Sequence, residues 1–551
     1  MLLKSKPIIA FLLFASVFAY SQDKPKGQLH GNFNIDAQQY KADSLIGAEK
    51  PAENVLMNAY GNFTYTYGNF SAGLRYEAYL NTLEGYDKSY NGQGISYRYL
   101  SYNNDGLGIT VGNFYEQFGN GLLLRTYQEK MLGYDNAFDG VRVSFSAIKG
   151  LTIKGIVAKQ RLFWGTEGLV RGVDGELSIN ELFESIKDAK TQVIIGGNYV
   201  SKYQADKDPF LKLPENVGAS SGRISIANGG FVLSGEYAQK CMDPSSDNGY
   251  IYKQGQALLV NATYSRKGLG IYLTGKRVDN MSFRSDRGQH INNLNINYLP
   301  DVAKIHVYTL TAMYPSATQA NGEMGMRSEI MYKFKKKSLL GGKYGTEIGV
   351  AYSRVNDIDR QAASDTSAIG VKGYLGYKSD FFKIGEEEFY EDITLSLSKK
   401  VSKKIKFHVE YMNQTYNFLA LRGESDHSGY DMVYAQMGVA DLSWKIKRRR
   451  TIRFEAQGLF TKQDKQDWAM GMIEFTMAPN WFIAVYDAYN YGNHHADKRL
   501  HYATGTVGFT KNSTRIQLSY GKSIEGVVCV GGVCRVVPAT NGFSISISST
   551  F

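Results

Sequence analysis

The sequence predicts an all-β protein: a single large antiparallel up-and-down transmembrane β-barrel of about 26 strands, with short periplasmic turns and long extracellular loops. Three observations predict it. Apolar and polar residues alternate with a period of two through most of the chain. Short and long connections between these runs also alternate. The chain ends on one more alternating run, Gly542 to Phe551, with small polar residues on its second face.

That final run has the pattern of the strand that closes an outer-membrane barrel. Such strands end on an aromatic residue that the barrel assembly machinery reads, so we expect that machinery as a partner. We also expect pairing with the first alternating run, around Leu29 to Ala37, because unpaired strand edges do not persist in hydrocarbon. The apolar face of the final run is the predicted assembly signal: Phe543, Ile545, Ile547 and Phe551.

The first residues predict export. A basic start is followed by an apolar stretch from Pro7 to Phe18 and by Ala19-Tyr20-Ser21 before Gln22, which is typical of a cleaved signal peptide. We therefore expect a signal peptide at 1–21 and one barrel domain at 22–551, located in the outer membrane of a Gram-negative cell. No later apolar run reaches the roughly 18 residues of a membrane helix. The mean hydropathy of −0.32 does not exclude membrane-spanning strands, because the apolar and polar residues of an alternating strand average to near neutrality.

Composition favours one continuous β domain. The chain contains 40 Tyr, 28 Phe and 58 Gly but only 10 Pro, and these are residues of strands, aromatic girdles and turns. No linker divides it. The net charge of +11 does not predict nucleic-acid binding, because the chain is exported and has no RNA-binding signature.

Two runs are needed mainly to keep the strands running alternately up and down. They begin at Val173 and at Leu294, the second extending to Tyr298. Without both, the count falls to about 24, which is also even. A β-sandwich is disfavoured, because the inward faces carry charges that a dry core would not tolerate unpaired.

Charges of opposite sign recur two residues apart on these inward faces. This spacing indicates a wet lumen crossed by ion pairs, which either hold the barrel wall or form a selectivity filter. The paired positions are Arg75 with Glu77, Arg327 with Glu329 and Arg453 with Glu455; Glu347, Lys406, His408, Glu410 and Asp487 are also predicted to face inward.

The short turns are basic at Lys335–Lys337, at 399–404 and at 445–450. Clustered cations at a membrane edge bind anionic headgroups at about 1 kcal/mol each. We expect them to contact outer-membrane lipids and to be available to other envelope proteins. The alternative is that they are solvated turns that block edge pairing.

A glycine-rich stretch from Val111 to Lys130 brings four polar residues near a strand mouth: Glu116, Gln117, Arg125 and Glu129. We expect a loop folded inward to narrow the pore rather than an active site. This stretch, with 132–136, 140–142 and 529–538, resembles an uncharacterised family of Bacteroidota outer-membrane, porin-like proteins. The resemblance covers essentially the whole mature chain. It implies a barrel and its location but no activity.

The cysteines are few. Cys529 and Cys534 flank Val-Gly-Gly-Val in an exported loop, where disulfides persist and glycines let the sulfurs meet, so we expect a bond between them. Zinc bound by these two and by His494 and His495 is the alternative. Cys241 is expected to be a lone or partner-bonded thiol. No metal or other cofactor is expected.

Three functions compete. The first is a porin-like channel for small solutes, with a loop partly filling the lumen. The second is a non-catalytic structural or accessory subunit of an outer-membrane assembly or secretion complex. A surface hydrolase using Asp426 and His427 is a remote third, because no G-x-S-x-G motif accompanies them, and we expect no enzyme activity. The first strand begins close to Gln22, so energy-coupled import through a preceding plug domain is not expected.

Overall fold

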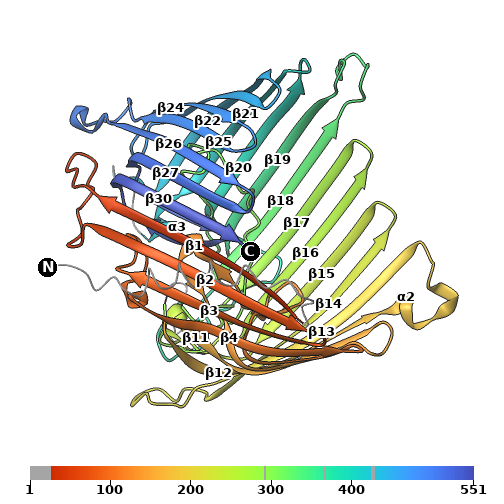
Figure 1. The fold of residues 1–551 in the computed structure, drawn as a ribbon. Coiled ribbons are helices and arrows are strands. Elements are labelled where there is room, and N and C mark those ends of the chain that lie inside the picture. The colour runs from red at the N-terminus through yellow and green to blue at the C-terminus, as the bar shows by residue number, and fades with distance from the viewer. Residues whose placement is uncertain (1–26, 291–292, 365–367, 424–428) are drawn as a thin grey trace.

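The computed structural model describes residues 27–290, 293–364, 368–423 and 429–551. It contains one closed sheet of 24 antiparallel strands (Figure 1). The first half of the ring consists of β1 (Gln28–Tyr40), β2 (Val55–Tyr67), β3 (Phe70–Leu80), β4 (Gly92–Asn104), β5 (Leu107–Phe114), β10 (Phe138–Phe145), β11 (Leu151–Leu162), β12 (Gly165–Ser178), β13 (Thr191–Tyr203), β14 (Asn216–Asn228), β15 (Phe231–Lys240) and β16 (Gly255–Arg266).

The second half consists of β17 (Leu269–Asp279), β18 (Gly322–Lys333), β19 (Thr346–Ile358), β20 (Ile384–Lys400), β21 (Ile405–Asn417), β22 (Met432–Lys447), β23 (Arg450–Thr461), β24 (Trp468–Met477), β25 (Trp481–Tyr489), β26 (His501–Lys511), β27 (Thr514–Ser523) and β30 (Thr540–Thr550). Short helices α2 (Ile179–Leu182) and α3 (Phe418–Arg422) lie in connections. No helix in the described part of the chain has the length and apolar character to cross a membrane.

The ring closes between its first and last strands. β30 pairs with β1 on one side and with β27 on the other, with Ile547 opposite Ile35 and Ile545 opposite Ala37. The backbone of Phe551 exchanges two hydrogen bonds of 2.9 Å with Gly31. Closure removes both sheet edges, as a barrel in hydrocarbon requires.

Of the two uncertain runs, one is a barrel strand. The run from Val173 lies in β12 and pairs on both sides, as predicted. The run from Leu294 to Tyr298 is not a barrel strand. It lies inside the barrel, where Leu294 and Ile296 are fully buried, so the strand prediction was wrong there. A segment lying along the inner wall also buries alternate side chains, so its pattern is the same as that of a strand.

The outer wall is apolar. Outward side chains such as Val350, Leu395 and Ile473 are 44%, 46% and 54% exposed, which is the arrangement of a lipid-facing band. Asp487 is a correction to the predicted inward set. It shares a strand face with the outward Val485 and bonds His501 at 2.6 Å.

The two ends of the barrel differ. We call the end with connections such as 68–69 and 512–513 the turn end, and the other the loop end. Along β15, inward residues change from 36% exposed at Val232, near the turn end, to 0% at Lys240. Along β18 they change from 49% at Met331 to 1% at Glu323. The lumen is therefore filled at the loop end and open towards the turn end.

Three connections from the loop end fill it. They are loop 115–137, segment 280–321 as far as it is described (280–290 and 293–321), and hairpin 524–539. Their apolar residues join inward wall residues in two large buried clusters. Loop 115–137 contains the short strands β6 (Gln117–Phe118), β7 (Leu124–Arg125), β8 (Gln128–Glu129) and β9 (Tyr134–Asp135), and hairpin 524–539 contains β28 (Gly526–Val530) and β29 (Val533–Val537).

Candidate functional site

The candidate site is the filled loop end of the lumen. Loop 115–137 is anchored there by Phe118 and by Leu122 to Leu124, which are all 0% exposed. Its glycines let the chain pass close to the wall. Gly119 has φ +51°, and a Cβ atom on it would lie 2.6 Å from the carboxylate of Glu236 on β15. The glycine-rich stretch therefore forms a loop folded into the barrel.

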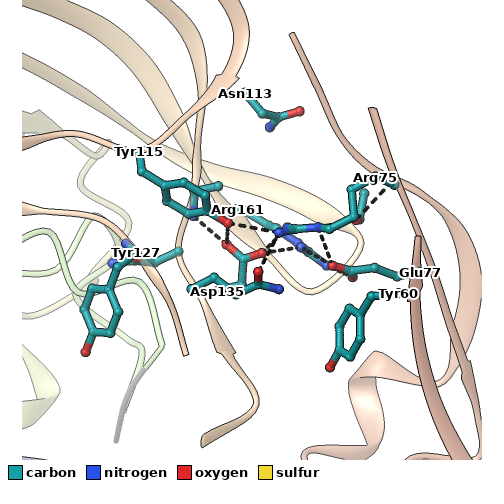
Figure 2. Close-up of polar contacts among 12 residues, drawn as sticks. Tyr60, Arg75, Glu77, Asn113, Tyr115, Tyr127, Asp135 and Arg161 are labelled. Carbon is teal, nitrogen blue, oxygen red and sulfur yellow. Dashed lines mark hydrogen bonds and ion pairs between the residues drawn. The ribbon is translucent and has the colours of Figure 1, made fainter. Parts of the chain in front are cut away.

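A buried ionic network fastens this loop to the wall (Figure 2). Arg75 and Glu77 of β3 pair with each other at 2.8 Å, and Glu77 pairs with Arg161 of β11 at 2.6 Å. Asp135, from β9 of the loop, pairs with Arg161 at 2.7 Å and also contacts Arg75. All four side chains are at most 5% exposed. Two guanidinium groups thus balance two carboxylates, and Tyr115 Oη donates to Asp135 at 3.0 Å.

The other predicted residues of the loop have different surroundings. Glu116 is buried and accepts a hydrogen bond from Lys154 of β11 at 3.0 Å, besides contacting Arg142 of β10. Gln117 is exposed; its side-chain amide donates to the carbonyl of Gly119 at 2.8 Å, and its own carbonyl accepts from Lys154 at 3.3 Å. Glu129 accepts from the backbone of Met131 at 3.0 Å, which caps a 3-10 turn.

Arg125 joins the loop to segment 280–321. Its backbone N–H donates to the carbonyl of Ile296 at 2.8 Å. Its guanidinium lies 4.0 Å from the centre of the Tyr298 ring and 4.9 Å from that of Tyr127. Arg125 is thus a packing residue between two lumen segments.

The other two predicted pairs stay on the wall. Arg327 contacts Glu329 on β18, and Arg453 of β23 pairs with Glu455 at 2.5 Å and with Asp441 of β22 at 2.8 Å. The structure does not bring these pairs together with the network around Arg75. The predicted residues therefore form separate groups and not a single constriction ring.

Sequence reasoning missed the lysines that hold segment 280–321. Lys240 of β15 donates to the carbonyl of Ser282, and Lys276 of β17 donates to that of Pro300 at 2.5 Å. Lys276 also contacts Glu323, and Asp243 balances Lys240 at 3.7 Å. These buried lysines lie near the loop ends of their strands. The alternation of apolar and polar residues predicts that they face inward, but it does not predict what they contact.

His306, in the same segment, was also missed. Its Nε2 lies 3.4 Å from a carboxylate oxygen of Asp392 on β20, and its Nδ1 lies 3.9 Å from Glu410 on β21. Burial acts to lower the pKa of His306, but the two carboxylates outweigh it, and the pKa lies above its ordinary value of 6.5. Next along, Tyr308 stacks on His408 with ring centres 6.0 Å apart.

Hairpin 524–539 carries the predicted cysteine pair. Cys529 and Cys534 lie opposite each other on β28 and β29 and are joined by a disulfide. This bond leaves neither thiolate for a metal. Among described residues no group of His, Cys, Asp and Glu is arranged to hold one. His494 instead bonds Gln466, and Cys241 is free and exposed.

The signal peptide and the pair Asp426–His427 lie outside the described residues. The structure therefore does not test the hydrolase alternative.

A closed ring, an apolar outer wall and a charged lumen define a membrane β-barrel of the outer-membrane type. The chain belongs to the family described as "Family of unknown function (DUF6029)", whose model matches residues 3–551. The Bacteroidota origin that the resemblance implies stays a prediction. No curated protein matches the chain.

Several solved barrels are similar in outline. The translocation pore of the P pilus usher PapC has 10% identity and a TM-score of 0.44, covering 95% of this chain and 99% of that one. The siderophore receptor PirA from Pseudomonas aeruginosa has 9% identity and a TM-score of 0.39, covering 96% and 81%. The outer membrane protein opdK from the same organism has 9% identity and a TM-score of 0.32, covering 73% and 97%. At these scores the likeness says nothing about what this chain binds or transports.

Proposed function

We propose that the protein is an outer-membrane transport barrel for small solutes, kept closed at its outer end by its own lumen segments. The turn end opens to the periplasm. The observation that carries the proposal is the change in lumen exposure, from 49% at Met331 to 1% at Glu323 along a single strand. A wall of 24 strands encloses a space wide enough for transport, and connections between strands fill its loop end in the described part of the chain.

The ionic contacts support gating over free diffusion. The charges around Asp135 and Arg75 are paired and buried, so they neutralise one another and attract no free ion. Because the closing pieces are connections and not strands, they can move without breaking the barrel ladder. The resting protein should conduct poorly.

Planar-bilayer recording tests this proposal. The wild type is compared with a variant in which residues 299–317 are replaced by a short glycine-serine linker, with a heat-modifiable band confirming that each folds. We expect rare, small steps from the wild type and large, stable steps from the variant. Large steady steps from the wild type, or no increase in the folded variant, would contradict the proposal.

A second candidate, an accessory subunit, is favoured by the basic turns. They join the consecutive strands β18 to β23 and contain no acidic residue at 335–345, 399–404 or 445–450. Leu339 and Leu340 project from the first turn, 98% and 58% exposed. Cations beside exposed leucines on one arc suit anionic headgroups of the membrane leaflet.

Native mass spectrometry of retained lipid tests this arc. Lys335–Lys337 and 447–450 are changed to Glu, and Arg266 and Lys267, in a turn outside the arc, are changed as the control. If the barrel is an accessory subunit, only the first variant should lose the band of a complex on native gels. Loss of anionic phospholipid with no change on native gels would make the turns lipid contacts and would contradict the accessory role.

A further inference from the structure

Residues 304–307 of segment 280–321 form a short stretch in the lumen that has no partner strand among the described residues, and a turn follows at Tyr308. From Lys304 to Thr309 the side chains are alternately less and more exposed. His306 and Tyr308 point to the wall, as described above. Ile305 and Val307 point the other way and are 67% and 83% exposed, in a lumen whose loop end is otherwise filled.

The backbone of this strand is unpaired. Within the described chain, the N–H and C=O groups of Ile305, His306 and Val307 make no hydrogen bond; the nearest partnered amides are those of Lys304, to Ser353, and Leu310, to Gln457. An unpaired strand edge is a template for another strand. The feature therefore indicates a place where a strand can be added.

A cavity of about 490 Å³ adjoins this strand. Its other side is formed by hairpin 524–539, including Ile524, Gly526 and Val528. Strand β28 pairs only with β29 among the described residues, and it also lies close to residues 130–132 of loop 115–137. The Cys529–Cys534 disulfide holds the hairpin in this shape. The cavity thus lies between the unpaired backbone of Ile305 to Val307 and this hairpin, and its size is in the range of ligand pockets.

We propose that this cavity binds a short extended peptide, which adds a strand against residues 304–307 and packs on the hairpin. The proposal rests on the transport function above and narrows its small solutes to short peptides. The peptide backbone supplies the donors and acceptors that Ile305 to Val307 lack, and small apolar side chains at alternate positions pack beside Ile305 and Val307. An acyl chain would leave this backbone unpaired.

Charge contributes little to which ligands this cavity prefers. Of the charged residues that line it, Asp301 interacts with the buried Lys276, Lys304 interacts with Glu410, and Glu525 lies 3.8 Å from Lys465. We therefore expect recognition by backbone and by apolar side chains, with weak dependence on salt.

The test is direct binding, measured by fluorescence anisotropy on full-length, disulfide-intact protein in detergent. The probe is a fluorescein-labelled octapeptide of alternating serine and valine. The control peptide has the same sequence with alternate amides N-methylated along one edge. We expect the control to bind about tenfold more weakly or worse, because it loses several backbone hydrogen bonds. Equal binding of the two peptides, or no binding of the first, would overturn the proposal.

Hydrogen exchange locates the bound peptide. Amides of residues 305–309 should exchange rapidly in the free protein and become protected when the octapeptide is added. Binding without that protection would indicate an apolar pocket for other ligands and would overturn the proposal.

Variants complete the test. Ile305→Asp with Val307→Asp should weaken octapeptide binding by about tenfold or more, because burying two carboxylates against the peptide is costly. Leu339→Asp, at an equally exposed leucine in a turn, is the matched control and should bind as the wild type does. If the double variant does not fold, the comparison of the two peptides binding to the wild-type protein still tests the proposal. None of these measurements depends on conductance, so failure of peptide binding and failure of the transport proposal are separable.

Discussion

Asp135→Ala should release loop 115–137 from the barrel wall. Asp135 is the one carboxylate that this loop contributes to the network, and it contacts both Arg75 and Arg161. Without it, Glu77 alone faces two buried guanidinium groups. Removing one partner of a buried ion pair costs about 3–5 kcal/mol, since the remaining charge is left uncompensated.

That cost acts on the docked loop and not on the barrel strands. At about 1.4 kcal/mol for each factor of ten, it raises the population of the undocked loop by about two to three and a half orders of magnitude. Asp139→Ala is the matched control. Asp139 pairs with Arg98 at 2.9 Å, but that guanidinium is 59% exposed, and such pairs contribute about 1 kcal/mol or less.

Hydrogen exchange of residues 117–135, with bilayer conductance on the same samples, measures the effect. In Asp135→Ala the loop amides should exchange faster by about two orders of magnitude or more, with more frequent channel openings. Asp139→Ala should match the wild type in both. The reasoning is refuted if the folded Asp135→Ala protein keeps wild-type protection in this loop.

Three other predictions follow from separate parts of the molecule. The pKa of His306 lies above 6.5 in the folded protein, so its ion pairs with Asp392 and Glu410 stabilise docking fully below that pH and are lost as pH rises through the folded pKa. After correction for intrinsic rates, exchange of the bonded amides of Lys304 and Leu310 should therefore increase from mildly acidic to alkaline pH in the wild type. In His306→Gln, amide exchange should no longer depend on pH in this way. Identical pH profiles for the two proteins would contradict the role of the His306 ion pairs in docking. Alkylation of unreduced, denatured protein should label Cys241 only, and labelling of all three cysteines would remove the disulfide. Deletion of Gly542–Phe551 should abolish the heat-modifiable folded band in cell envelopes, because β1 and β27 would both lose a partner; a normal level of inserted protein would contradict the closing role of β30.

The sequence by itself determined the barrel. A period of two is local, and it separates an apolar from a polar face in every strand without reference to the rest of the chain. The same locality explains why pairs such as Arg453 with Glu455 were predictable, because residues two apart on one strand share a face. The pairing of the last strand with the first also followed, since an open edge is not stable in hydrocarbon.

The tertiary structure decided what fills the lumen. The run from Leu294 to Tyr298 has the alternation of a barrel strand, but its apolar residues are buried against lumen neighbours, and alternation reports that a face is covered without saying what covers it. Arg75 was predicted beside Glu77, but its contact with Asp135 spans 60 positions. The free backbone of Ile305 to Val307 has no sequence signal either, because an absent hydrogen bond depends on where the neighbouring chain lies. Contacts between loops and wall join residues far apart in the chain, so only the folded barrel defines the closed loop end and the cavity within it.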